Sequence, residues 1–228
     1  MVPDRQPQTT TRAPAGAFAL AVVAGLAALG GTAGAAELVM RDIGVGLELP
    51  PAGFTYDLSS SGGDRSGSDS FSSPFGIDLH GRYSLARTGD AVGVVLGAGL
   101  AGERASYTTG GTWAAYSVRG TAGGGWAATD RLTLLAEALV GVGIASLDLD
   151  STSTFSAVSV KGPALTIGVQ ASAHFALSES LVLAGGVGWR RTDAPMTGGG
   201  TDAHLVLSGV GAFLALDWRL SDRPFLLE

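Results

Sequence analysis

Three things that the sequence lacks narrow the choice of fold. There is no cysteine among the 228 residues, so no disulfide can stabilise the chain. After residue 35 no stretch reaches the roughly 18 apolar residues of a membrane-spanning helix, and no helical pattern with caps is present. Basic residues are also few, 14 against 20 acidic ones. This balance argues against nucleic-acid binding, which requires a basic surface.

The first 35 residues have the pattern of a cleaved secretory signal peptide. Arg5 and Arg12 precede an apolar run rich in Ala, Val and Leu, and a group of small residues follows it. Cleavage is expected after Ala35, with Ala36 as the alternative. A transmembrane anchor is the competing interpretation, because the run is about long enough to span a bilayer. The Ala-Gly-Ala sequence that ends the run is typical of a cleavage site and favours cleavage. The mature chain, 36–228, then has a net charge of −7.

Glycine is abundant, with 36 residues, but the chain has neither the repeat of collagen nor the low hydrophobicity of a disordered protein. Glycine normally weakens a strand. In a small closed barrel it leaves room where inward side chains crowd. An exported chain without disulfides must hold itself by burial or by a closed hydrogen-bond network, which a barrel provides.

The stretch from Trp113 to Leu147 predicts two long strands joined by a tight turn at 129–131. Apolar residues occupy every second position in both arms, which indicates strands with one apolar face. Strands of soluble proteins average about 5–6 residues, so this length favours a membrane hairpin over a hairpin of a soluble β-sandwich. Tyr116 and Trp126 are separated by about 25 Å along a tilted barrel axis, which fits one aromatic residue at each membrane interface.

Eight alternating segments follow one another, beginning near residues 42, 75, 92, 113, 132, 165, 181 and 204. They predict an all-β fold, an eight-stranded antiparallel up-and-down transmembrane β-barrel in residues 36–228. The phase of 205–208 is ambiguous. An outward aromatic girdle is predicted from Phe75, Tyr83, Tyr116, Trp126, Phe175, Trp189 and Trp218.

The connections between the segments alternate in length. Tight turns are expected after the second, fourth and sixth segments, at 87–90, 129–131 and 178–180. Longer polar loops are expected at 56–74, around 108–111, at 148–159 and at 192–202. This alternation is typical of a bacterial outer-membrane barrel with short periplasmic turns, longer external loops and both termini inside.

Taken together, the signal peptide, the eight amphipathic strands and the alternating loops resemble the small eight-stranded outer-membrane barrels of the OmpA, OmpX and opacity type. The resemblance covers essentially the whole mature chain and rests on architecture, so it implies a fold and not a role. The run from Gly211 to Trp218 is similar to the signal that the barrel-assembly machinery reads in such proteins. The chain departs from their pattern after Leu220, because it continues to Glu228 instead of ending on an aromatic residue.

Charged and titratable side chains are predicted on the inward faces: Glu48, Asp78, Glu103, Glu137 and Asp217, with Arg82, Arg119, Arg190 and Arg219, and with His80 and His174. The side chains of an eight-stranded barrel fill its lumen, and an unpaired charge out of water is costly. These groups are therefore expected to pair and to plug the lumen. Arg119 and Glu137 are expected to pair, because they lie nearly opposite each other across the turn at 129–131. A proton or ion path is the competing interpretation.

No catalytic or metal site is predicted, and no cofactor is expected. Some eight-stranded barrels deacylate lipid A with a close His–Ser pair, and the nearest candidates here are His204 and Ser208. Four residues along a strand separate them by roughly 13 Å, too far for direct proton transfer. His80, Asp78 and Ser84 share an inward face, but a filled lumen leaves no room for an acyl chain. No cluster has metal-ligand spacing.

Three classes of function fit this pattern. The first is an outer-membrane barrel with a structural or surface-interaction role, whose partners are membrane lipid, the barrel-assembly machinery and an extracellular ligand met by the loops. The second is a narrow channel for small solutes. The third is a soluble periplasmic lipocalin-like binding barrel, in which apolar side chains would point inward and polar ones outward.

Overall fold

The computed structural model describes residues 37–60, 63–86, 92–107, 110–150 and 157–220, and the contacts below belong to these ranges. The predicted signal peptide, the predicted turn at 87–90 and the tail after Leu220 lie outside them. In the part of the chain that is described, no helix has the length and apolar character needed to cross a membrane.

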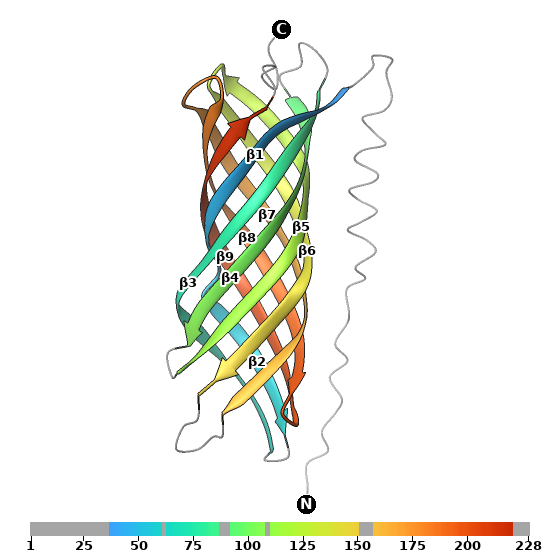
Figure 1. Cartoon of the computed structure of the whole chain (residues 1–228), viewed down its shortest axis with the longest axis vertical. Coiled ribbons are helices and arrows are strands. Elements are labelled where there is room, and N and C mark those ends of the chain that lie inside the picture. Colours follow the sequence, from blue (N-terminus) through green and yellow to red (C-terminus); the bar gives the residue numbers. More distant parts are fainter. Residues whose placement is uncertain (1–36, 61–62, 87–91, 108–109, 151–156, 221–228) are drawn as a thin grey trace, which may run out of the picture. The chain divides into compact units, whose positions relative to one another are not determined.

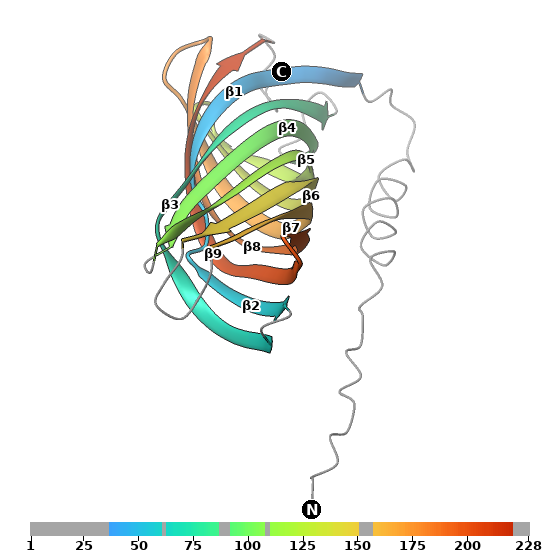
Figure 2. The same cartoon turned by 60° about the horizontal axis from the view of Figure 1, so that its bottom comes forward.

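Within these ranges the chain forms nine strands, namely β1 (Glu37–Leu49), β2 (Gly53–Ser60), β3 (Gly63–Ala86), β4 (Val92–Tyr107), β5 (Gly111–Thr129), β6 (Leu132–Leu149), β7 (Val158–Ala176), β8 (Leu181–Gly198) and β9 (Thr201–Arg219). All neighbouring pairs are antiparallel, and the strands stand side by side as one curved wall (Figures 1 and 2). Both β1 and β2 pair with β3 on one side and with β9 on the other. They are two parts of one wall strand, so the predicted eight-stranded up-and-down barrel is confirmed.

The wall strand is divided between β1 and β2 at Pro50 and Pro51. Proline has no backbone N–H to donate to a neighbouring strand. Pairing with β9 therefore stops at Leu49 and resumes at Phe54. The adjacent strand β3 carries an irregularity at the same place, between Ser72 and Phe75. The barrel wall thus bends where the two proline residues interrupt its hydrogen bonds.

The two tight turns that the structure describes are confirmed. β5 ends at Thr129 and β6 begins at Leu132, and the Thr129 hydroxyl accepts hydrogen bonds from the amides of Arg131 and Leu132 at 3.3 and 3.1 Å. After β7, the Ser178 hydroxyl accepts a hydrogen bond from the Leu181 amide at 3.1 Å. A side-chain oxygen thus satisfies backbone donors at both turns, as Thr and Ser commonly do.

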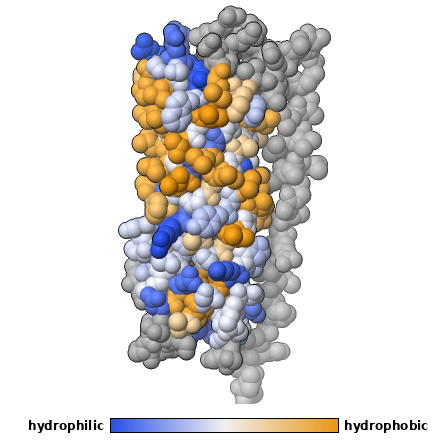
Figure 3. Space-filling model, viewed as in Figure 1, coloured by the Kyte–Doolittle hydropathy of each residue, from blue (hydrophilic) through white to orange (hydrophobic). Residues whose placement is uncertain are grey.

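The outer surface carries an apolar belt, which appears as the orange band in Figure 3. All seven residues of the predicted girdle lie on this face and are 38–64% exposed. Tyr83, Trp126, Phe175 and Trp218 lie near the end with the tight turns, whereas Phe75, Tyr116 and Trp189 lie near the other edge of the belt. Apolar side chains outside and charged ones inside are the arrangement of a transmembrane barrel. The faces of the belt are therefore opposite to those of the lipocalin-like alternative.

The strands continue beyond the belt, away from the tight turns. β3 to β9 are 16 to 24 residues long, whereas about 9–11 residues cross a membrane. We call the surplus the extension; it comprises 53–60, 63–72, 104–107, 111–115, 145–149, 158–164 and 191–207. Its outer face is largely polar (Figure 3). The predicted loops at 56–74 and 192–202 are therefore wrong, because both are mostly paired strand, and the loop at 148–159 is shortened at both ends.

Inside the extension the side chains form an apolar core. Phe71 stacks between Phe54 and Trp113, with ring centroids 4.3 and 5.8 Å away. Met196 and Leu205 are also fully buried there. The phase of 205–208 is thus settled, with Leu205 and Leu207 pointing inward. The polarity of the two faces reverses between belt and extension, because water replaces lipid outside.

The hairpin of β8 and β9 explains why a loop was expected in this region. Gly199 and Gly200 connect the strands with φ values of 57° and 78°, which is the two-residue turn that requires positive φ at both positions. A Gly-Gly pair between alternating residues is a known hairpin signal. The cluster of Gly, Thr and Asp around it hid that signal, because such composition also predicts a loop.

We expect trypsin to leave the bonds after Arg65 and Arg191 intact in the folded barrel. Both residues lie in paired strands, opposite Leu58 and Ser208 respectively, and cleavage requires local opening of the paired backbone. Mass spectrometry of a digest in detergent measures this, and the same protein unfolded in urea should be cut at both sites. Rapid cleavage after Arg191 in the folded sample would contradict the paired strand and support the predicted loop at 192–202.

Candidate functional site

Most charged residues that the structure describes in the lumen gather in two clusters within the belt. The central cluster consists of Glu48, Glu103, Arg119 and Arg190, from β1, β4, β5 and β8. The mouth cluster consists of Asp42, Asp78, His80, Arg82, His174 and Asp217, from β1, β3, β7 and β9. The mouth cluster lies at the end with the tight turns, since Arg82, His174 and Asp217 each directly precede an aromatic residue of that edge of the belt.

In the central cluster two arginine and two glutamate side chains form ion pairs across the lumen. Arg119 Nη1 donates to both oxygens of Glu48 at 2.8 Å, and its Nη2 donates to Glu103. Arg190 Nη1 lies 3.0 Å from Glu48 Oε2 and 2.8 Å from Glu103 Oε1. Each carboxylate thus contacts both guanidinium groups. This mutual pairing is what charged groups removed from water require.

The predicted pair of Arg119 and Glu137 is wrong. In the β5–β6 hairpin Arg119 lies opposite Gly141, and Glu137 lies opposite Gly123. Glu137 instead accepts hydrogen bonds from Thr121 Oγ1 at 2.9 Å and from Gln170 Nε2 at 3.0 Å. Arg119 reaches across the lumen to β1 and β4. Because the wall is closed, Arg119 lies closer to residues of other strands across the lumen than to Glu137 of its own hairpin.

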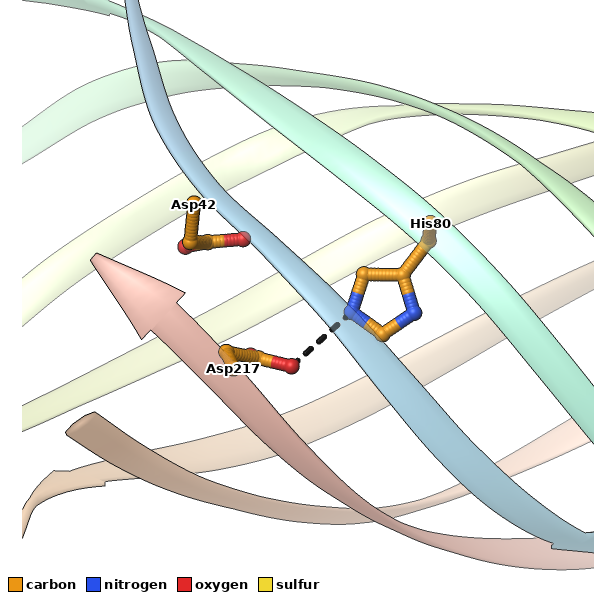
Figure 4. Close-up of side chains that lie close together, drawn as sticks. All are labelled: Asp42, His80 and Asp217. Atoms are coloured by element: carbon orange, nitrogen blue, oxygen red, sulfur yellow. Dashed lines mark hydrogen bonds and ion pairs between the residues drawn. The ribbon is translucent and has the colours of Figure 1, made fainter. Parts of the chain in front are cut away.

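The mouth cluster is organised around His80 and Asp217. His80 Nε2 lies 3.0 Å from Asp217 Oδ1 (Figure 4). The other ring nitrogen, Nδ1, contacts Asp78 Oδ1. Arg82 Nη1 donates to Asp217 Oδ2 at 2.9 Å and to Asp42 Oδ1 at 3.4 Å. Asp42 also pairs with its neighbour Arg41, whose Nε lies 3.2 Å away. Asp217 is completely buried, so three charged or imidazole partners surround a carboxylate that water does not reach.

Gly44 makes this approach of His80 and Asp217 possible. A Cβ atom at Gly44 would collide with Asp217 Oδ1 and lie 2.8 Å from His80 Nε2. The side chains of β3 and β9 therefore meet over the bare backbone of β1, which lies between these two strands. Any larger residue at this position would separate the histidine from the carboxylate.

His174 adds a second imidazole to the mouth cluster. Its Nε2 lies 3.0 Å from Ser172 Oγ, and its Nδ1 lies 3.5 Å from Asp217 Oδ2. The order hydroxyl, imidazole, carboxylate is that of a serine hydrolase triad. However, all three residues are buried, and neither cavity described below is lined by Ser172 or His174.

Two cavities of about 40 Å³ each lie within the belt. Asp78, His80, Arg82, Glu48 and Arg119 line the first, which therefore connects the mouth cluster to the central cluster. The second borders Glu48 on the side of Gln170, Arg190 and Phe213. A bound water needs about 10–15 Å³ of such volume, so each cavity accommodates about three waters.

Among the predicted lumen residues, the structure buries Arg82, Glu103, Arg119, Glu137, His174 and Asp217. Arg219 lies opposite Asp42 at the end of β9. The site also contains residues that were not predicted from the sequence, namely Asp42, Arg41, Ser172, Thr121 and Gln170. Asp42 shares the alternation of Gly44, Gly46 and Glu48 along the strand, so its inward orientation could have been predicted from the sequence. His204 lies outside the lumen, on the outer face of the extension, where its Nε2 contacts Asp193 at 2.7 Å and not Ser208.

A scan with models of protein families found no match, and a search among curated proteins found none. Solved structures that resemble the chain include Neisserial surface protein A, NspA, at 14% identity over 76% of this chain and 95% of that chain, with a TM-score of 0.41. Ail of Yersinia pestis matches at 15% identity over 80% and 100%, with a TM-score of 0.37. The outer membrane protease OmpT from Escherichia coli matches at 7% identity over 82% and 99%, with a TM-score of 0.43. Such likeness assigns no activity or residue role; the chain is a β-barrel similar in fold to bacterial outer-membrane proteins.

Proposed function

We propose that this chain is a non-conducting outer-membrane barrel that anchors a rigid β-extension outside the membrane, where the extension meets external partners. The proposal is supported by two sets of contacts, which together would close the lumen at two levels. The ion pairs of Glu48 and Glu103 with Arg119 and Arg190 cross it within the belt. The apolar core of the extension fills it beyond the belt. Since solutes would not pass through the lumen, the outer surface is where partners would bind.

The two levels exclude solutes for different physical reasons. Passage through the central cluster requires separation of buried ion pairs, which leaves charges without partners at high cost. Passage through the extension requires displacement of packed aromatic rings, such as Phe54 and Phe71, which are 5% and 4% exposed. A hydrated ion gains nothing from that apolar surrounding. Water can enter the polar cavities of the belt, but the apolar core opposes its exit.

The outer face of the extension supports the interaction part of the proposal. Acidic and basic side chains lie close together on β8 and β9. Asp193 contacts His204 at 2.7 Å and Arg191 at 3.4 Å. Asp57 of β2 lies opposite His204. At the open end of the extension, on the inward face that also carries Phe54 and Phe71, hydrogen bonds from the Tyr107 hydroxyl and the Ser70 amide lower the pKa of Asp69. Strand pairing holds these groups in fixed positions, so a partner would meet a preformed surface.

Planar-bilayer recording of the purified, refolded chain tests the closed lumen. We expect no stable porin-sized conductance, and at most rare small openings, because eight strands leave almost no free lumen once side chains are packed. Heat-modifiable migration of the same sample on a gel, before and after reconstitution, controls for correct folding. Steady large conductance would overturn the proposal and favour the narrow-channel alternative in a wider or oligomeric form.

A further inference from the structure

Side chains with the chemistry of metal ligands converge in the mouth cluster. His80 Nε2 and carboxylate oxygens of Asp42 and Asp217 all lie within 4.8 Å of one another (Figure 4). The three residues come from β3, β1 and β9, which are paired neighbours in the wall, so the sheet itself fixes their spacing. Imidazole nitrogens bind Zn²⁺, Cu²⁺ and Ni²⁺, and carboxylates complete many such sites.

His174 provides an independent observation that points to a cation. Its side chain is fully buried and its Nδ1 atom has no hydrogen-bond partner, although Asp217 Oδ2 lies 3.5 Å away. Ser172 Oγ contacts the other ring nitrogen, which holds Nδ1 toward the carboxylate. A buried polar atom without a partner is costly. A tetrahedral ion with bonds of about 2.1 Å separates its ligands by about 3.4 Å, and the distance of 3.5 Å from His174 Nδ1 to Asp217 Oδ2 is close to that value.

The surroundings of His80 match those of a metal-bound imidazole. Asp78 contacts Nδ1 and so orients the ring with Nε2 toward Asp217 and Asp42. Metal-binding histidines commonly donate their second nitrogen to a carboxylate in this way. From these contacts we propose that the mouth cluster binds one divalent transition-metal ion of the Zn²⁺ class through His80, Asp217 and Asp42, whose ligand atoms already lie together, and through His174, whose ring would shift toward them from its contact with Asp217.

Arg82 competes with the ion for the same carboxylates. Its Nη1 contacts Asp217 Oδ2 at 2.9 Å and Asp42 Oδ1 at 3.4 Å. Binding of a divalent ion requires this guanidinium to withdraw. Arg82 also lines the cavity of about 40 Å³ between the two clusters, which provides space on the side toward Glu48. The positive charge beside Asp217 is thus supplied either by Arg82 or by the metal ion, while Arg41 stays paired with the other oxygen of Asp42.

The cluster lies near the tight-turn edge of the belt, a short distance from water. Arg82, His174 and Asp217 directly precede Tyr83, Phe175 and Trp218, which lie at the tight-turn edge of the belt. Aromatic residues at a belt edge mark the interface between lipid and water. The ion would join β1, β3, β7 and β9 at this end of the barrel, and its expected effect is to stabilise the fold.

Zn²⁺ and Co²⁺ titrations of the refolded full chain in detergent test the proposal. We expect one ion per barrel, a higher melting temperature with Zn²⁺, and visible Co²⁺ absorption typical of four-coordinate nitrogen and oxygen ligands. His80→Ala and His174→Ala should each weaken binding by more than about tenfold, since loss of even an outer partner commonly costs about 10–100-fold. Arg82→Met should strengthen binding because it removes the competing cation.

The chain offers a matched control, because it has three histidines and the third lies on the extension. His204→Ala should leave the affinity unchanged. Since a mouth variant can also fail to fold, X-ray absorption of the Zn²⁺-loaded wild-type barrel provides a second measurement, and it should show two imidazole ligands. Absence of stoichiometric binding, fewer than two imidazoles, binding lost with His204→Ala, or binding lost with Arg82→Met would each overturn the site.

Discussion

Replacement of Arg119 by alanine should lower the free energy of unfolding by about 3–5 kcal/mol, because removal of one partner from a buried ion pair leaves uncompensated charge. Arg119 is 5% exposed and contacts both Glu48 and Glu103. In its absence Arg190 Nη1 alone faces the two carboxylates. Urea titration of the barrel in lipid vesicles, followed by tryptophan fluorescence, measures the loss.

Double-mutant cycles distinguish the observed partners from the one expected from the hairpin. Arg119 and Glu103 should show a coupling energy of at least about 1.5 kcal/mol, whereas Arg119 and Glu137 should add within about 0.5 kcal/mol. Glu137→Gln should cost only about 0.5–1.5 kcal/mol, because its partners Thr121 and Gln170 are neutral. If Arg119→Ala cost less than about 1 kcal/mol, the central cluster would not be the buried network described above.

Val140→Arg should lower stability by about 2–4 kcal/mol, the range for an arginine facing lipid near the midplane of a barrel. Val140 is 53% exposed on the outward face of β6. It lies about midway between Leu134, opposite Trp126, and Ile144, opposite Tyr116. Folding into lipid vesicles, read by heat-modifiable gel migration and by urea titration, gives the change. At Leu134, at the belt edge, the same substitution should cost about 0–1 kcal/mol.

Val206→Arg is the matched control for this depth dependence. Val206 also points outward, but it lies in the extension between Thr55 and Asp193. Arginine there enters water beside a carboxylate, so the change should stay within about 0.5 kcal/mol. Equal losses for Val140→Arg and Val206→Arg would mean that the belt and the extension have the same surroundings, and the division of the barrel into two parts would be wrong.

The sequence by itself determined the barrel, the number of wall strands and the outward face within the belt. Alternation is a local property, since each residue points away from its neighbours, so Trp126, Val140 and Trp189 could be assigned without a structure. The inward placement of Glu48, Arg119 and Asp217 followed from the same parity.

Only the tertiary structure decided which residues meet and where the membrane ends. The partners of Arg119 depend on closure of the wall, which brings β1, β4 and β8 across the lumen, and no spacing along the chain encodes that distance. His80 and Asp217 are 137 positions apart, so their approach over Gly44 was equally hidden. Much of the extension, including 56–72 and 192–202, was predicted as loops. The prediction assumed that the outer face of every strand is apolar. Beyond the belt water replaces lipid, and the same alternation then places Phe54 and Leu205 inside.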